Sequence, residues 1–234
     1  MKFLEFDESR DFPFYNHNPR ISEFGWLVML LSVPVAFLTY GLMGSKPGME
    51  LISSIIFCLI MLLPLLYFSN WDYSLMFRKP TKNEIILAVL LFLGYMIYML
   101  VVGNVLDTFA LSGVKLSTAE SMGINAGSMI GLIFSMMAEE LLKFIPLMFL
   151  MRVVYKFRGN LNLAVAISVT IVLLVFALLH YAPPTNTLAS VLLLQGFGSM
   201  FEMYGYLKTK NLFVPYLSHL LIDAVSFIII ILGG

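Results

Sequence analysis

Seven stretches of the chain are long and apolar enough to cross a lipid bilayer, and this feature limits the fold more than any other. A membrane-spanning helix needs about 20 predominantly apolar residues. The stretches cover residues 24–44, 49–68, 84–103, 124–151, 163–181, 187–207 and 212–232. With 60% apolar and 12% charged residues, the chain also has too few charges for a soluble surface. We therefore predict an all-α fold, a polytopic transmembrane helix bundle of about seven spans, or eight if residues 100–117 also enter the bilayer.

The basic residues are distributed unevenly around these stretches. Those that lie ahead of the first stretch or in every second connection are Lys2, Arg10, Arg20, Arg78, Lys79, Lys82, Arg152, Lys156, Arg158, Lys208 and Lys210. The other connections hold only Lys46 and Lys115. Because basic loops stay in the cytoplasm during insertion, we predict a cytoplasmic N-terminal tail, residues 1–23. It precedes a single transmembrane helical domain, residues 24–234, which ends on the opposite side.

The composition excludes two further classes of protein. Lys plus Arg and Asp plus Glu number 14 each, so no net charge attracts nucleic acid. The single cysteine, Cys58, can form no disulfide within the chain, which excludes a disulfide scaffold. His17 lies in the polar tail, where we expect it to be solvated.

The fourth stretch carries three charged side chains where lipid is expected, in the sequence EELLK that begins at Glu139. A charge at the bilayer centre costs about 2.5–3.5 kcal/mol or more, so such residues face a cavity and usually serve a function. Glu139 and Lys143 are four residues apart, which puts them on one helix face and lets them pair. Glu140 points about 100° further round the helix.

Two later stretches hold the histidines that lie outside the tail. The fifth stretch ends at His180, and the seventh contains His219 and Asp223. The last two are four residues apart, so the carboxylate can orient the imidazole. Imidazoles and carboxylates together in an apolar protein indicate a metal site, an acid–base site or a proton path.

The sixth stretch adds one more carboxylate, Glu202. It either lines the same cavity, pairs with Lys143 or reaches the membrane surface. Gly196, Gly198 and Gly205 give this stretch a face of small residues, which predicts close helix packing.

In this order, the polar residues resemble the motifs of the CPBP family of intramembrane proteases, also called the CAAX-protease, bacteriocin-processing or Abi family. That family carries a Glu-Glu pair followed by a basic residue, then Phe-x-x-x-His, then His-x-x-x-Asn or His-x-x-x-Asp. The matching positions are Glu139, Glu140, Lys143, Phe176, His180, His219 and Asp223. The family's arginine falls one place after Lys143, at Phe144, and the E-E-x-x-K spacing is similar to that of PrsW-type membrane proteases. The resemblance covers residues 124–227.

The resemblance implies an intramembrane endopeptidase and a role for each matching residue. Glu139 would be the general base that activates a water, His180 would position that water, and His219 would polarise the scissile carbonyl or stabilise the oxyanion. Asp223 is assigned to orienting His219. Glu140 and Lys143 would hold the helix in register. The implied catalytic set is Glu139, Glu140, His180, His219 and Asp223, supported by Lys143, Phe176 and Glu202.

The family has also been described as metalloproteases. Zinc, if present, would bind His180, His219 and Glu139, but we favour a metal-free mechanism. The expected substrate is a membrane-embedded or membrane-delivered protein or peptide, such as a bacteriocin, pheromone or signalling precursor, in a bacterial plasma membrane.

Two other functions fit the same residues. One is a non-catalytic family member that acts as a membrane immunity or regulatory binding protein. The other is a proton-coupled transporter, although no repeat relates the two halves of the chain, as it does in many transporters.

The expected depths of the two histidines are in conflict. His180 falls near the outer end of its stretch, whereas His219 falls nearer the inner end of a parallel one, at about 1.5 Å of rise per residue. A single site therefore requires helices that are offset along the membrane normal, or a fifth helix that starts deep in the membrane.

Overall fold

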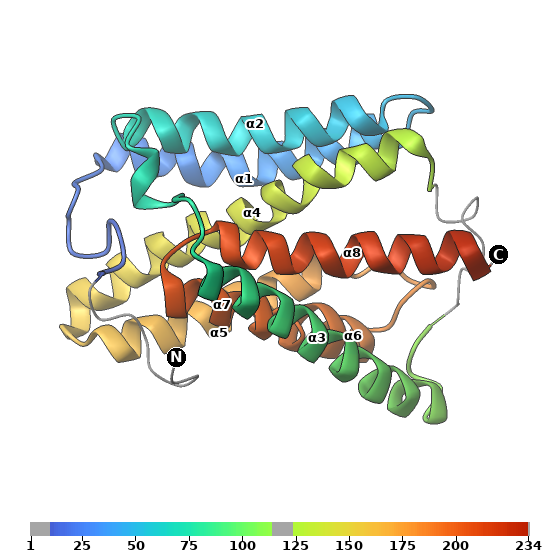
Figure 1. Ribbon diagram of the computed structural model, residues 1–234. Helices are drawn as coiled ribbons and strands as arrows, with labels where there is room; N and C mark the ends of the chain where they lie inside the picture. The colour runs from blue at the N-terminus through green and yellow to red at the C-terminus, as the bar shows by residue number, and fades with distance from the viewer. Residues whose placement is uncertain (1–9, 114–123, 234) are drawn as a thin grey trace.

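The protein is a bundle of helices in the computed structural model, which describes residues 10–113 and 124–233 (Figure 1). The elements are α1 (Glu23–Gly44), α2 (Glu50–Phe68), η1 (Tyr73–Leu75), α3 (Lys82–Thr108), α4 (Ala126–Arg158), α5 (Leu161–Leu179), α6 (Leu188–Ser190), η2 (Val191–Phe197), α7 (Met200–Thr209) and α8 (Phe213–Gly233). The described residues contain no strand, and the predicted all-α fold is confirmed. The helices α1, α2, α3, α5 and α8 are long and apolar enough to span a membrane, which supports a multi-pass membrane protein.

The other two predicted stretches are not among these helices. The fourth is α4, a helix of 33 residues that carries the charged side chains. The sixth is divided into α6, the π-helix η2 and α7; π-helical segments are rare and often lie at functional sites. Residues 100–108 continue α3 to its end, so the described part of 100–117 forms no separate eighth span. Residues 114–117 lie outside the described residues.

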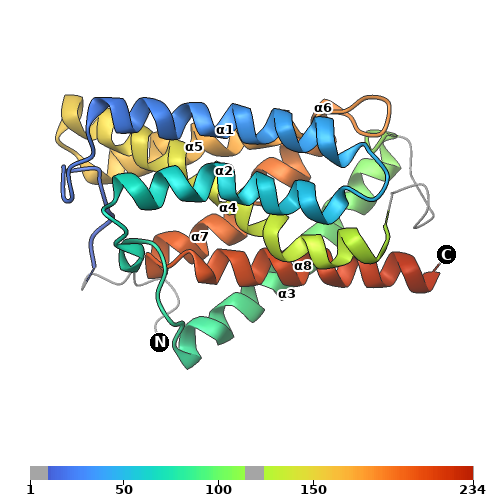
Figure 2. The same cartoon turned by 90° about the horizontal axis from the view of Figure 1, so that it is seen from above.

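The long helices alternate in direction, and this places the described basic connections together (Figures 1 and 2). The starts of α1 and α5 and the ends of α2 and α4 form one end of the bundle, which we call the basic end. The starts of α3 and α8 and the end of α7 point toward the same end but lie deeper in the bundle (Figure 1). The opposite end, which we call the far end, includes the last turn of α1 and the first turns of α2 and α4. That the basic end faces the cytoplasm remains a prediction from the charges.

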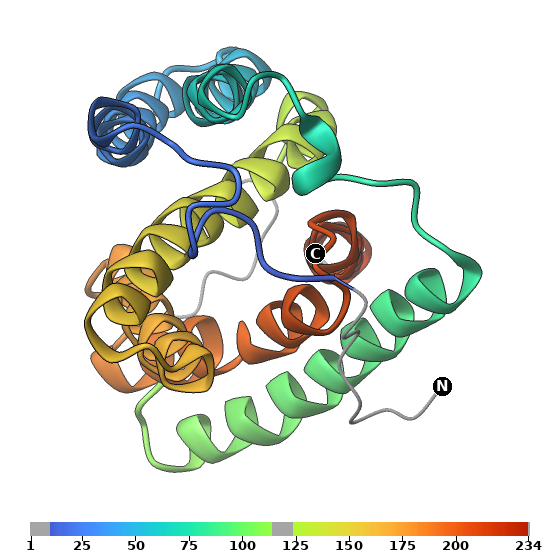
Figure 3. The same cartoon turned by 90° about the vertical axis from the view of Figure 1, so that its left-hand side faces the viewer.

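The segment before α1 is folded onto the basic end. Figure 3 looks at this end, and the blue segment passes across it. Phe14 and Tyr15 are buried, and the Tyr15 hydroxyl donates a 2.9 Å hydrogen bond to Asp11. Burial and this bond raise the pKa of Tyr15 to about 12, so the phenol remains a donor. His17 is exposed, as expected.

The small residues of the sixth stretch allow close packing, as predicted. A Cβ at Gly196 would lie 2.9 Å from Ala177 in α5, and one at Gly205 would lie 2.9 Å from Leu91 in α3. A Cβ at Gly198 would lie 2.7 Å from the ring of Tyr95. These glycines therefore let η2 and α7 approach the helices on either side.

Candidate active site

A tight hairpin brings Glu139 and His180 to the same depth. Gly159 ends α4 in the left-handed conformation, with φ of 61°, which glycine adopts without steric cost. The side chain of Asn160 then caps α5 by accepting a bond from the Leu163 amide. Glu139 and His180 lie about 20 residues before and after this turn, so two antiparallel helices with the same rise place them level.

An offset of α8 brings His219 to that depth as well. His219 lies six residues after the start of α8, about 9 Å along its axis. Glu139 lies 19 residues before the end of α4, about 28 Å. The start of α8 is therefore about 20 Å deeper than the end of α4, an offset visible in Figure 1. Offset helices resolve the conflict that the sequence posed.

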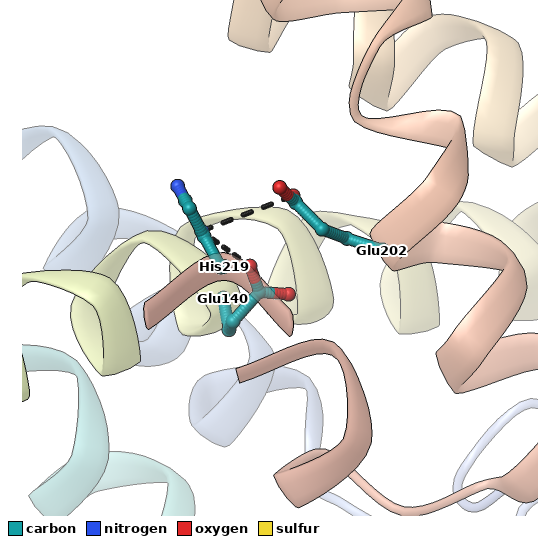
Figure 4. A group of neighbouring side chains, drawn as sticks. All are labelled: Glu140, Glu202 and His219. Carbon is teal, nitrogen blue, oxygen red and sulfur yellow. Dashed lines mark hydrogen bonds and ion pairs between the residues drawn. The ribbon is translucent and has the colours of Figure 1, made fainter. Parts of the chain in front are cut away.

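The buried half of the site is a network of charges around Lys143. Its side chain is only 2% exposed and its ammonium lies 2.7 Å from Glu140 Oε1, with a second ion pair to Glu202 from α7. His219 shares the same carboxylate, because its Nδ1 lies 2.8 Å from Glu140 Oε1. Figure 4 shows Glu140, Glu202 and His219 directed toward one another. Two carboxylates therefore compensate one buried cation and hold α4, α7 and α8 together.

These contacts correct one expectation and confirm another. We predicted a pair between Lys143 and Glu139, but Lys143 pairs with Glu140, three residues away, and with Glu202. A lysine can reach a partner either three or four residues away on a helix. Here the Lys143 ammonium points toward Glu202 of α7, and in that position it contacts Glu140. Of the three alternatives for Glu202, the pair with Lys143 is the one that the structure contains.

The accessible half of the site is centred on Glu139. Its Oε2 atom lies 3.9 Å from His180 Nε2 and 3.8 Å from His219 Nε2. Glu139 is 20% exposed and His180 32%, in contrast to Glu140 and Lys143. Gaps of this length are too long for direct hydrogen bonds, and a small molecule such as water can bridge them.

The second ring nitrogen of each histidine is fixed by an acceptor. His180 Nδ1 lies 2.9 Å from the Phe176 carbonyl, which can only accept, so this nitrogen carries a proton. His219 Nδ1 donates to Glu140 in the same way. Both Nε2 atoms are therefore left to face Glu139, which is how a second hydrogen bond sets the function of an imidazole.

Asp223 lies at the edge of this group rather than in the role we expected for it. Its Oδ2 atom is 4.0 Å from His219 Nε2, beyond hydrogen-bond length. The hydrogen bond that orients His219 comes from Glu140 instead. Asp223 is 31% exposed and adds negative charge beside the Nε2 atom.

Two sets of side chains have the donor types of a metal site. Ligand atoms of Glu140, Glu202 and His219 lie within 4.8 Å of one another, but Lys143 pairs with both carboxylates, so this set already holds a cation and does not fit a metal. The set predicted from the sequence, Glu139, His180 and His219, has the donor types of a zinc site, but its ligand atoms do not all lie within 4.8 Å of one another. It offers two imidazole nitrogens and a carboxylate, and each imidazole is anchored through Nδ1 as metal ligands usually are.

Asn186 is a contributor that the sequence did not indicate. Its side-chain amide donates a 2.7 Å hydrogen bond to the His180 carbonyl, and its side-chain oxygen accepts a 2.8 Å bond from the Ala182 amide. It therefore fixes the turn in which α5 ends. Phe176 supports the site more directly, because its ring centroid lies 4.6 Å from that of His180 and 4.8 Å from the Lys143 ammonium.

The fold and the site together define a class: a multi-pass helical membrane protein with a carboxylate–histidine site within the bundle. Residues 123–225 match the family described as type II CAAX prenyl endopeptidase Rce1-like. This match agrees with the resemblance that the motifs predicted, and the matched family is one of proteases. No curated protein and no solved structure gives a significant match.

Proposed function

We propose that this protein is an intramembrane endopeptidase that hydrolyses a peptide bond with a water activated by Glu139. One observation carries the proposal: both histidine Nε2 atoms face one oxygen of Glu139 at 3.8–3.9 Å. A water between these three atoms would have Glu139 as an acceptor for one proton, and each Nε2 would either accept its other proton or, in a charged imidazole, donate to its lone pair. General base catalysis of this kind contributes about 10²–10⁴-fold in rate.

The proposed reaction is a hydrolysis with Glu139 as proton carrier. Glu139 takes a proton from the water while the water oxygen bonds to the carbonyl carbon, which forms a tetrahedral oxyanion. His219 or His180, when its imidazole is charged and carries a proton on both nitrogens, stabilises this oxyanion through Nε2–H. The carbon–nitrogen bond then breaks, and Glu139 returns its proton to the departing amine. The products are a carboxylate and an amine.

The remaining polar residues act as positioning residues in this proposal. Glu140 holds His219, and Lys143 with Glu202 holds Glu140. A zinc ion bound by Glu139, His180 and His219 would supply Lewis-acid polarisation and a more acidic water.

The proposed substrate is a protein or peptide that is embedded in the membrane or delivered to it, such as a bacteriocin, pheromone or signalling precursor. The proposed location is a bacterial plasma membrane. The family match supports a protein or peptide substrate, and the long apolar helices support a membrane location.

Comparative mass spectrometry of membrane and secreted peptides tests the activity. Cells would express the native protein or Glu139→Gln at matched levels, with Glu23→Gln as a control at an exposed carboxylate far from the site. New peptide termini that depend on Glu139 alone would support the proposal and identify the substrate. Identical peptide profiles, with the cellular role retained by Glu139→Gln, would contradict it and favour a non-catalytic binding protein.

A further inference from the structure

A polar cavity of about 420 Å³ opens at the far end of the bundle. This volume is within the range of about 300–1,000 Å³ typical of ligand pockets. The cavity lies between the last turns of α1 and α8 and the first turns of α2 and α4, a region visible at the α1–α2 connection in Figure 2. We call it the serine vestibule, and the side chains used below are Tyr40, Ser45, Ser53, Ser54, Ser135 and Phe227.

The hydroxyls of the vestibule are arranged as hydrogen-bond acceptors. Ser53 and Ser54 each donate to the Glu50 carbonyl at 2.9 Å, and Ser135 donates to the Gly131 carbonyl at 3.2 Å. A serine hydroxyl has one proton and two lone pairs, so each oxygen keeps acceptor capacity toward the cavity. The wall therefore suits a ligand rich in N–H donors, and an extended peptide backbone has one at almost every residue.

The inner end of the vestibule adjoins the candidate site. Ser135 lies one helical turn before Glu139 on α4, and Phe227 lies one turn after Asp223 on α8, so each pair shares a face. Tyr40 of α1 also lines the cavity. The two carboxylates do not line the cavity, but both are partly exposed, Glu139 by 20% and Asp223 by 31%.

The basic end, in contrast, is partly covered by the N-terminal segment, which lines a cavity of about 520 Å³ there. Phe12 stacks obliquely on Tyr206, with ring centroids 6.0 Å apart, and the Lys210 ammonium lies 5.2 Å from the Phe12 ring. Phe14 and Tyr15 pack against Trp26 and Tyr155. The N-terminal segment therefore covers the helix ends on the side opposite the vestibule.

We propose that the serine vestibule is the route by which water and an extended peptide segment reach Glu139 from the far end of the bundle. The acceptor lining favours a segment with small or polar side chains and unpaired backbone N–H groups. That the occupant is a peptide to be cleaved rests on the proposed function. The proposal that water reaches Glu139 through the vestibule does not depend on the proposed function.

Cysteine labelling tests the route without any measurement of activity. In a Cys58→Ala background, Ser54→Cys and Ser135→Cys would be exposed to a charged, membrane-impermeant thiol reagent in sealed vesicles of each orientation. Ser45→Cys marks the far end, and Lys79→Cys marks the basic end, since both native side chains are exposed. Ser168→Cys, at a fully buried position, is the control for inaccessible thiols.

The expected labelling pattern is specific. Ser54→Cys and Ser135→Cys react from the same side as Ser45→Cys. Because thiol reactivity follows exposure to water, and Ser54 and Ser135 are 3% and 4% exposed, they react more slowly than Ser45→Cys but faster than Ser168→Cys at 0%. Ser135 lies nine residues into α4, about 13 Å along the helix, so labelling there requires water at depth. Reaction from the Lys79 side, or reaction only after the bilayer is dissolved, would overturn the proposal.

The same variants test whether the substrate peptide enters through the vestibule. A bulky adduct on Ser54→Cys is expected to lower cleavage at least about tenfold relative to the same variant before modification, because it obstructs positioning of the substrate. Full cleavage with complete modification would overturn the vestibule as the substrate route. An absence of cleavage before modification, with the labelling pattern intact, would instead contradict the proposed function alone.

Discussion

Replacing Lys143 by methionine removes the one cation between two buried carboxylates. Lys143 is 2% exposed and Glu140 4%, and their 2.7 Å separation corresponds to about 6 kcal/mol of Coulomb attraction at an effective dielectric constant near 20. Part of this attraction offsets the desolvation of the ions. Removal of one partner from a buried pair typically costs about 3–5 kcal/mol, because the other charge stays buried. We therefore expect Lys143→Met to destabilise the protein by about 3–5 kcal/mol.

The double variant Lys143→Met/Glu202→Gln sharpens this expectation. It removes one negative charge together with the positive one and leaves Glu140 with His219 as its partner. We expect it to be more stable than Lys143→Met, with a coupling free energy of about 0.5–3 kcal/mol, as is typical of residues in one network. No such recovery is expected when Glu202→Gln is combined with Lys79→Met at the exposed control lysine.

Reversible unfolding in mixed detergent micelles measures these differences, with the fluorescence of buried Trp26 as one reporter. Lys79→Met should change the free energy of unfolding by no more than about 0.5 kcal/mol, as surface substitutions usually do. If Lys143→Met behaves like Lys79→Met, or if the double variant loses the sum of the two single losses, the charge network does not stabilise the fold.

Three further results are expected. Glu139→Gln should lower cleavage by at least about 10²-fold in a peptide assay while changing the free energy of unfolding little. Glu140→Gln should also destabilise the protein by about 1–3 kcal/mol. Equal stability of the two variants would contradict the division of the site into a catalytic half around Glu139 and a structural half around Glu140. Asn186→Ala should lower the turnover number with KM nearly unchanged and cost about 1 kcal/mol, since it holds the turn behind His180; a change confined to KM would argue against that role. Phe14→Ala should cost about 3–5 kcal/mol in detergent unfolding, because this ring is 1% exposed; a loss below 1 kcal/mol would mean that the N-terminal segment does not stabilise the bundle.

The sequence predicted the helices and the motif residues because both depend on local pattern. Apolar length identified the helices, and a spacing of four residues placed His219 and Asp223 on one face. The offset of α8 could not be predicted, since it depends on where the short α7 and its connection end. The covering of the basic end was missed because Phe12, Phe14 and Tyr15 are too few to form a periodic pattern.

The partner of Lys143 shows a second limit of prediction from the sequence. Helical spacing tells which residues of one helix share a face, but not which face meets another helix. Glu139 and Glu140 were both within reach of Lys143 on α4, and the choice between them was made by Glu202 on α7. Asn186 was missed for a similar reason, because its side chain acts on the backbone of a turn whose shape no helical pattern specifies.

The shifted basic residue of the first motif acquires a physical explanation from these contacts. The family's position for arginine holds Phe144 here, and that ring is buried against Tyr206, 5.3 Å between centroids in an edge-to-face pair. A cation at Phe144 would face this aromatic packing. Placed one residue earlier, about 100° round the helix, the Lys143 ammonium meets both Glu140 and Glu202. The shift of the basic residue and the carboxylate on α7 therefore form one arrangement. The double variant Lys143→Leu/Phe144→Arg places the cation at the family's position. It should disrupt both the aromatic pair and the ion pair that positions Glu140, and so destabilise the protein more than Lys143→Met does.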